Sequence, residues 1–170
     1  MTSKRTVCNK PVRNTLTMLS PVGKLTLVAS SKGLVAIDVR NNAKQVVTEK
    51  NASAQAILIK TKKQLEQYFG GKRTSFDVVL DLVGTEFQVR AWRALCRIPF
   101  GKTISYGQQA ANVKKPKAFR AVGSANGKNP IPIIVPCHRV VASDGSLGGY
   151  SLGLKMKIQL LALEGVSEAE

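Results

Sequence analysis

The sequence predicts an α+β protein whose strands come first and whose helices dominate the second half. Apolar and polar residues alternate over residues 14–20 and 24–30, on either side of a turn at residues 20–23, which is the pattern of a hairpin. Apolar residues recur at helical spacing over residues 53–69 and again after Thr85. We therefore expect a small sheet with one covering helix, followed by a mainly helical region.

The N-terminal strands are expected to form a meander. Residues 31–33 carry a second turn signal, and residues 34–39 predict a third strand, so an antiparallel meander is the simplest topology. The helix over residues 53–69 ends at Gly70–Gly71, and its apolar stripe is interpreted as core packing.

A second domain is predicted to begin at Gly84, after an extended connector over residues 75–83. The predicted domains are therefore residues 1–83 and residues 84–170.

The first helix of the second domain has a clear start signal. Thr85 and Gln88 match a capping box, in which each side chain bonds the backbone of the other residue. Trp92 lies on the apolar face of this helix and is interpreted as a core anchor. Cys96 is expected to pack inside as well, because no neighbour would deprotonate it.

Two helices joined by a basic turn are predicted next. Ser105 is a good N-cap for a helix that runs to about Asn112, and another helix is expected over residues 116–126. This is the order of a helix-turn-helix unit. The turn contains Lys114, Lys115 and Lys117. The second helix is rich in small residues, among them Ala121 and Ser124, which would permit close approach to a DNA groove or close packing against another helix.

The charge of the chain is strongly positive and unevenly distributed. Lysine and arginine number 26 against 10 acidic residues, for a net charge of +16, and no acidic residue occurs from Phe87 to Ser143. A surplus of this kind indicates a polyanionic partner, with nucleic acid as the first candidate. Lysines that merely keep the protein soluble would not explain the segregation.

Other classes find little support in the sequence. No apolar run reaches the roughly 18 to 20 residues that span a bilayer, and the basic N-terminus lacks the apolar core of a signal peptide. Three cysteines and one histidine have no metal-ligand spacing. We expect an intracellular, reducing compartment, no membrane association, no disulfide and no metal site.

A cysteine and a histidine stand side by side at the end of an apolar segment. Residues 131–141 predict a buried strand or extended segment broken by prolines, and it contains Cys137, His138 and Arg139. A free cysteine with a pKa near 8.5 is only about 3% thiolate at neutral pH, so a basic neighbour would activate it. The alternative is that Cys137 is a small buried apolar residue. His138 is the single histidine of the chain, which favours a reactive site.

The string Pro-Cys-His-Arg-Val at residues 136–140 resembles the active-site motif of the O6-alkylguanine-DNA alkyltransferases. The resemblance is convincing from Tyr68 to Gly165 and loose before that. The other matching segments are Ser105-Tyr106-Gly107, Ala118-Phe119-Arg120-Ala121-Val122-Gly123, Ala125-Asn126-Gly127, Asn129-Pro130, Gly149-Tyr150-Ser151, Leu160-Leu161 and Glu164-Gly165.

The resemblance implies a ribonuclease H-like N-terminal domain and a C-terminal winged helix-turn-helix domain that holds the active site. It implies a methylated-DNA–protein-cysteine S-methyltransferase that repairs DNA by direct reversal. The protein would enter the minor groove of double-stranded DNA and flip out O6-alkylguanine, and O4-alkylthymine as well. It would transfer the alkyl group irreversibly to Cys137, in a single turnover. No cofactor, a monomeric state, and location in the bacterial cytoplasm or the nucleus are also implied.

The resemblance assigns roles to individual residues. Cys137 would be the nucleophile, His138 would act through a bridging water, Glu164 would hold His138, and Asn129 would fix the preceding loop. Neighbouring side chains of an extended segment point apart, which argues against direct contact between Cys137 and His138. The base would be bound by Tyr106, Val140, Tyr150 and Ser151. Arg120 would fill the space left by the flipped base, and Lys114, Lys115, Lys117, Ala121 and Ser124 would lie at the DNA.

Three residues depart from the family pattern. Gln109 stands where leucine is usual and is expected to loosen the core behind the second helix. Phe119 replaces a small residue beside Arg120. Leu152 stands where glycine is usual, and we expect it to narrow the alkyl pocket, unless it packs against Leu154 or the C-terminal helix.

Three other functions fit the sequence less well than repair does. A non-catalytic lesion-binding relative would lack the cysteine, a cysteine hydrolase would not need an acid-free basic half, and a plain DNA-binding regulator would not explain residues 136–140.

Overall fold

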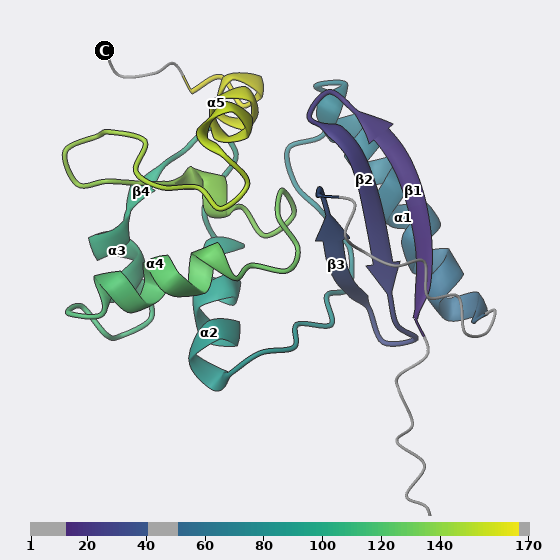
Figure 1. Cartoon of the computed structure of the whole chain (residues 1–170), viewed down its shortest axis with the longest axis horizontal. Helices are drawn as coiled ribbons and strands as arrows, with labels where there is room; N and C mark the ends of the chain where they lie inside the picture. Colours follow the sequence, from purple (N-terminus) through teal and green to yellow (C-terminus); the bar gives the residue numbers. More distant parts are fainter. Residues whose placement is uncertain (1–12, 41–50, 167–170) are drawn as a thin grey trace, which may run out of the picture.

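The computed structural model describes residues 13–40 and 51–166, and it confirms the α+β prediction. Strands β1 (Asn14–Ser20), β2 (Gly23–Ala29) and β3 (Leu34–Asp38) form an antiparallel meander in the order β1-β2-β3. Helix α1 (Ala52–Phe69) covers one face of this sheet (Figure 1). The sheet and α1 bury one shared apolar core, as the sequence predicts.

Local signals start and end these N-terminal elements. Gly23 adopts a φ of +110° at the hairpin turn, and the Ser20 hydroxyl group donates to its carbonyl group at 2.6 Å. The Asn51 side chain caps α1 by accepting from the Ala54 backbone at 3.0 Å. The connector is extended where it passes β3, because Leu34 exchanges backbone hydrogen bonds with residues 79 and 81.

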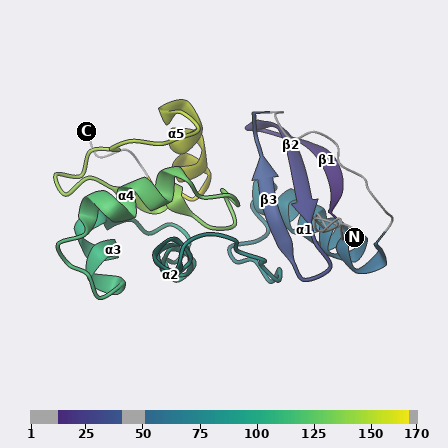
Figure 2. The same ribbon diagram turned by 60° about the horizontal axis from the view of Figure 1, so that its bottom comes forward.

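Helices dominate the rest of the chain. They are α2 (Glu86–Leu95), α3 (Tyr106–Asn112), α4 (Phe119–Gly127) and α5 (Leu154–Leu163). Figure 2 shows α2 beneath α4, and α3 beside α4. Two short strands, β4 (Ile104–Ser105) and β5 (Val140–Val141), pair in parallel. No helix in the described ranges is long and apolar enough to cross a membrane.

Several local predictions in this half are confirmed. Both Thr85 with Gln88 and Ser105 with Gln108 form complete capping boxes. Trp92 is buried, and its indole N–H donates to the Ala125 carbonyl group at 2.8 Å, which ties α2 to α4. The predicted core anchor therefore also fixes the helix that the sequence assigns to DNA.

The structure corrects the start of α4 and the place of Cys96. Helix α4 begins at Phe119, later than predicted, because Lys114 in the turn after α3 adopts a φ of +58° and Lys115 is held off the helical region by Pro116. Cys96 is exposed, because as the C-cap residue of α2 it lies outside the buried face formed by Ala91, Trp92, Ala94 and Leu95.

The predicted loosening at Gln109 is wrong. Gln109 is fully buried, but its side-chain amide exchanges two hydrogen bonds with the amide of Asn126, at 2.9 and 2.7 Å. Each buried polar group therefore has a partner, and the pair joins α3 to α4.

The segment before Cys137 is also not a strand. Residues 131–136 form a series of turns, and Cys137–Arg139 is a short 3-10 helix that leads into β5. Prolines 130, 132 and 136 lack the N–H groups that a sheet ladder needs. The loop bonds within itself instead, with the Val135 N–H donating to the Ile131 carbonyl group at 2.9 Å.

Candidate active site

Asn129 organises the loop that presents Cys137. Its amide nitrogen donates to the Val135 carbonyl group at 2.7 Å and to the Cys137 sulfur at 3.1 Å, and its oxygen accepts from the Ile131 N–H at 3.0 Å. The expected loop-fixing residue therefore also touches the thiol.

The loop stores backbone strain just before the thiol. Ile133 has a φ of +75° and is fully buried. A β-branched residue in this region is a true outlier and costs on the order of 1–3 kcal/mol. The buried apolar side chains and the Asn129 bonds hold the loop in this conformation, so the position of Cys137 is fixed by its surroundings.

His138 is hydrogen-bonded to Glu164. Its Nε2 lies 2.8 Å from a Glu164 carboxylate oxygen, and the side chain is fully buried. An ionised carboxylate only accepts, so Nε2 carries the proton and Nδ1 keeps a lone pair. Nδ1 has no hydrogen-bond partner among the described residues. Cys137 and His138 make no hydrogen bond with each other, as predicted, although they belong to a 3-10 helix and not to an extended segment.

Glu164 is the most heavily bonded side chain of the site. It lies buried at the C-cap of α5. Although burial opposes ionisation, hydrogen bonds from His138 and Arg139 lower the pKa of Glu164 to about 2. Its donors are Tyr68 Oη at 2.7 Å, His138 Nε2 at 2.8 Å, Arg139 Nε at 2.8 Å, Arg139 Nη2 at 2.9 Å and Gly101 N at 3.2 Å.

Arg139 bonds to the Glu164 carboxylate and not to the Cys137 thiol. Besides its two bonds to Glu164, its Nη1 donates to the Ile98 carbonyl group at 2.5 Å. The cationic neighbour expected from the sequence is therefore already neutralised by a buried ion pair.

The resting site holds a protonated thiol and a neutral imidazole. Burial raises the pKa of Cys137, against the opposing effects of the Asn129 amide, the Tyr150 hydroxyl group and the Lys157 ammonium. Burial also lowers the pKa of His138, although Glu164 works in the opposite direction. The arrangement thus supplies a thiol beside a base that can still accept a proton.

Lys157 is a site residue that the sequence analysis missed. Its side chain is fully buried, and its ammonium donates to the carbonyl groups of Val140, at 2.6 Å, and Leu147. Burial lowers the pKa of Lys157 to about 8, while the nearby Cys137 raises it. Helical spacing could have indicated its burial, because Lys157 lies on the same face of the helix as Leu160 and Leu161.

A cavity of about 340 Å³ opens beside the Cys137 sulfur. It brings together parts of α3, α4, the Cys137 turn and the loop before α5. Tyr106 closes one side, with its hydroxyl group donating to the Gly149 carbonyl group at 3.3 Å. Gly148, at a φ of +62°, lets the backbone approach the Tyr106 ring. The lining residues are Tyr106, Gly123, Asn126, Gly127, Cys137, Gly149, Tyr150 and Ser151.

Three of the four predicted base-binding residues line this cavity, and Val140 does not. The Val140 carbonyl group accepts from Lys157 instead, which leaves one lone pair for another donor. Leu152 is also outside the cavity. It borders a separate groove beside β3, with Ile37 and Pro132, and packs on the main core. This position does not support the predicted narrowing of the alkyl pocket by Leu152.

The predicted DNA-facing residues share an exposed surface. Arg120, Ala121 and Ser124 are exposed on α4, opposite the buried Val122 and Ala125. The Arg120 guanidinium lies over the Phe119 ring, 5.9 Å from its centre. The lysines of the turn, Lys114, Lys115 and Lys117, are exposed as well.

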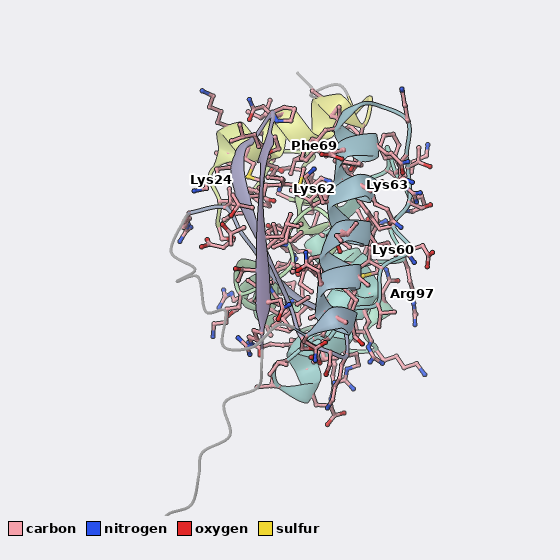
Figure 3. All side chains as sticks on the ribbon, turned by 90° about the vertical axis from the view of Figure 1, so that its right-hand side faces the viewer. Lys24, Lys60, Lys62, Lys63, Phe69 and Arg97 are labelled. Carbon is pink, nitrogen blue, oxygen red and sulfur yellow. The ribbon has the colours of Figure 1, made fainter. Side chains whose placement is uncertain are left out.

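A basic groove of about 620 Å³ runs between α2 and the turn after α3. Glu86 is the acidic residue at its edge, 3.8 Å from Arg90. Figure 3 shows the side chain of Arg97 projecting outward at the edge of the molecule. The cationic residues of the groove are Arg90, Arg93, Arg97, Lys114 and Lys115.

Comparison with known proteins places both domains. The sequence profile of the 6-O-methylguanine DNA methyltransferase DNA-binding domain matches residues 86–166, and that of the ribonuclease-like domain of the same proteins matches residues 13–82. The predicted combination of a ribonuclease-like and a DNA-binding domain is thereby confirmed.

Individual relatives agree with the profiles. A methylated-DNA–protein-cysteine methyltransferase of Methanosarcina barkeri is 45% identical over 146 residues, which cover 85% of this chain and 92% of the relative. The protein of that name from Mycobacterium leprae is 47% identical, with 86% and 89% covered. The crystal structure of Mycobacterium tuberculosis OGT in complex with DNA matches with a TM-score of 0.78 at 45% identity, over 87% of this chain and 90% of that one.

Proposed function

Since the chain belongs to the 6-O-methylguanine DNA methyltransferase family, we propose that it repairs alkylated DNA by moving the alkyl group from guanine O6 to the sulfur of Cys137. The observation that carries this proposal is the arrangement around the thiol. Cys137 lines a cavity of about 340 Å³ and is held by Asn129, next to a His138–Glu164 pair whose free ring nitrogen can accept a proton.

The proposed reaction balances without a cofactor. A water links Cys137 to Nδ1 of His138, and the thiol proton passes through it to the imidazole. The sulfur attacks the alkyl carbon, an S–C bond forms and the C–O6 bond breaks with its electron pair left on guanine. The imidazolium, stabilised by Glu164, returns the proton to the departing base. A thioether has no good leaving group, so each molecule reacts once.

The base must leave the duplex before it can reach the cavity. Extrusion costs a few kcal/mol, and less for a damaged pair. We assign Arg120 to the vacated space and Tyr106 to the wall that faces the extruded base. Tyr150 and Ser151 close over that base, and the free lone pair of the Val140 carbonyl group accepts from its amino group. O4-alkylthymine would enter by the same route.

The DNA surface in this proposal is the exposed face of α4 with the turn before it. Small side chains at Ala121 and Ser124 allow the helix to approach the minor groove closely, and Lys114, Lys115 and Lys117 contact phosphates. We further propose that the protein acts as an intracellular monomer and divides into residues 1–83 and 84–170.

Intact mass spectrometry tests the reaction. Wild-type protein incubated with a duplex that contains O6-methylguanine should gain the mass of one methyl group per molecule, located at Cys137. Cys137→Ala should bind the duplex without gaining mass. Repair of many lesions by each protein molecule would contradict the proposal, and so would methylation of the Cys137→Ala variant.

A further inference from the structure

Tyr68 connects the N-terminal domain directly to the proton relay. It lies in the last turn of α1, and its hydroxyl group donates to the Glu164 carboxylate at 2.7 Å across 96 residues of sequence. The side chain is fully buried. Its ring packs against Phe69 and Phe76, with centroids 5.3 Å away in both cases, and against Phe100 at 6.1 Å.

Tyr68 and His138 bond to the same carboxylate oxygen. Oε1 of Glu164 accepts from Tyr68 Oη, from His138 Nε2 and from Arg139 Nη2, whereas Oε2 accepts from Arg139 Nε and the Gly101 N–H. Donors that share one oxygen compete for its negative charge. The strength of the Tyr68 bond therefore affects how strongly Glu164 attracts the proton of His138.

We propose that Tyr68 is a positioning residue of the alkyl transfer, which orients Glu164 and limits the pull of that carboxylate on the His138 proton. The inference rests on the proposed function of Cys137 and His138. It gives the N-terminal domain a part in the reaction, because the last turn of α1 completes the bonding of a carboxylate in the other domain.

The charged groups around His138 determine in which direction loss of the Tyr68 hydroxyl group changes the protonation of His138. The charged groups that act on it are Glu164, Arg139 and Lys157. Removal of the Tyr68 hydroxyl group leaves these charges in place and leaves Oε1 with more charge to offer the imidazole. His138 should then become protonated at a higher pH, and a protonated imidazole cannot accept the thiol proton.

The test uses Tyr68→Phe, which removes one oxygen and keeps the ring contacts. The rate of methyl transfer is measured in single turnover, at saturating duplex with O6-methylguanine, from pH 5 to pH 9. We expect the acidic limb of the profile to move up by about 0.5 pH unit, so that the rate on the steep part of that limb falls by up to roughly threefold. The rate above pH 8 and the stoichiometry of one methyl group should be nearly unchanged.

Leu65→Ala is the matched control, because Leu65 is fully buried on the same helix and has no bond to Glu164. It should lower the free energy of unfolding and leave the pH profile of the rate in place. A purely structural role for Tyr68 predicts that Tyr68→Phe and Leu65→Ala behave alike, and this result would overturn the inference.

A second measurement does not depend on turnover. His138 is the single histidine of the chain, so its ring signals in an NMR titration are unambiguous. In Tyr68→Phe they should titrate at higher pH than in wild type, and superimposed titrations would overturn the inference. An unmoved profile with normal methyl transfer by wild type refutes only the role of Tyr68. No methyl transfer by wild type refutes the proposed function itself.

Discussion

At the residue scale, several buried polar groups of this protein bond to partners 10 to 17 residues away in the sequence. Gln109 and Asn126 exchange two hydrogen bonds between α3 and α4, and Lys157 bonds the carbonyl groups of Val140 and Leu147. Removal of one member leaves the other unsatisfied, and an unsatisfied buried amide costs about 1–3 kcal/mol. Each of these residues therefore has a partner on which its effect depends.

Gln109→Leu should destabilise the protein by about 1–3 kcal/mol, because it leaves the buried Asn126 amide without a hydrogen-bond partner. This loss is expected although leucine is the usual residue of the family. Chemical denaturation of Gln109→Leu, Asn126→Leu and the double variant measures the coupling. The double variant should recover part of the loss. Strict additivity of the two single losses would contradict the paired role.

Glu164 should make the stability of the protein depend on pH in the acidic range. Its pKa falls from the ordinary 4.5 to about 2 in the folded state, so the charged form stabilises the fold above about pH 4.5, by roughly 3 kcal/mol. This contribution should be lost as the pH falls from about 4.5 to 2. Denaturation at pH 7, 4 and 3 measures it. Glu164→Gln should be less stable at pH 7 and should show a smaller fall, and an equal fall would contradict the assignment.

At the scale of elements, the loop before α5 borders two different hollows of the molecule. Tyr150 lines the cavity beside Cys137, Leu152 borders the groove beside β3, and Ser151 between them borders both. The carbonyl group of Ser151 also accepts a hydrogen bond from Arg40, which follows β3. The loop is therefore held from the N-terminal domain on one side while it closes the cavity on the other.

Leu152→Gly should leave the preference for alkyl size unchanged, because Leu152 does not border the cavity. The ratio of benzyl to methyl transfer rates should agree within about twofold between wild type and variant. Stability should fall by roughly 1–2 kcal/mol, from lost apolar burial and a freer backbone. A large gain in benzyl transfer would restore the role in pocket size that the sequence first predicted.

At the scale of the whole molecule, the two domains contact each other beside the candidate active site. The Ile37 N–H donates to the Pro130 carbonyl group at 2.9 Å, next to the loop that Asn129 organises, and Tyr68 reaches Glu164. The positive charge lies elsewhere, since the basic groove follows α2 and the turn after α3. The C-terminal domain thus holds both the cavity beside Cys137 and the charged surface, and the N-terminal domain reaches the site through the bond from Tyr68 to Glu164.

The basic groove should strengthen DNA binding through charge alone. Arg93→Gln combined with Arg97→Gln should weaken duplex binding and reduce the slope of log affinity against log salt by up to about 2. The methyl transfer rate at saturating duplex should not change. Lys24→Gln combined with Lys63→Gln removes the same charge from exposed positions of the N-terminal domain (Figure 3) and serves as the control. Equal effects of the two pairs would show that only net charge matters.

The sequence by itself predicted much of the local structure and the candidate reacting group. The hairpin, the helix starts at Thr85 and Ser105, and the motif around Cys137 depend on residues close together in the chain, so periodicity and capping patterns predict them. The prediction for Gln109 was wrong because it considered that residue without its partner Asn126.

Only the tertiary structure decided which distant groups meet. The bond from Tyr68 to Glu164, the Gln109–Asn126 pair and the burial of Lys157 each require the chain to return on itself. The turns over residues 131–136 likewise follow from bonds to Asn129 and from a burial that no pattern of neighbours encodes. A buried polar group must find a donor or acceptor, and the fold as a whole determines which one lies within reach.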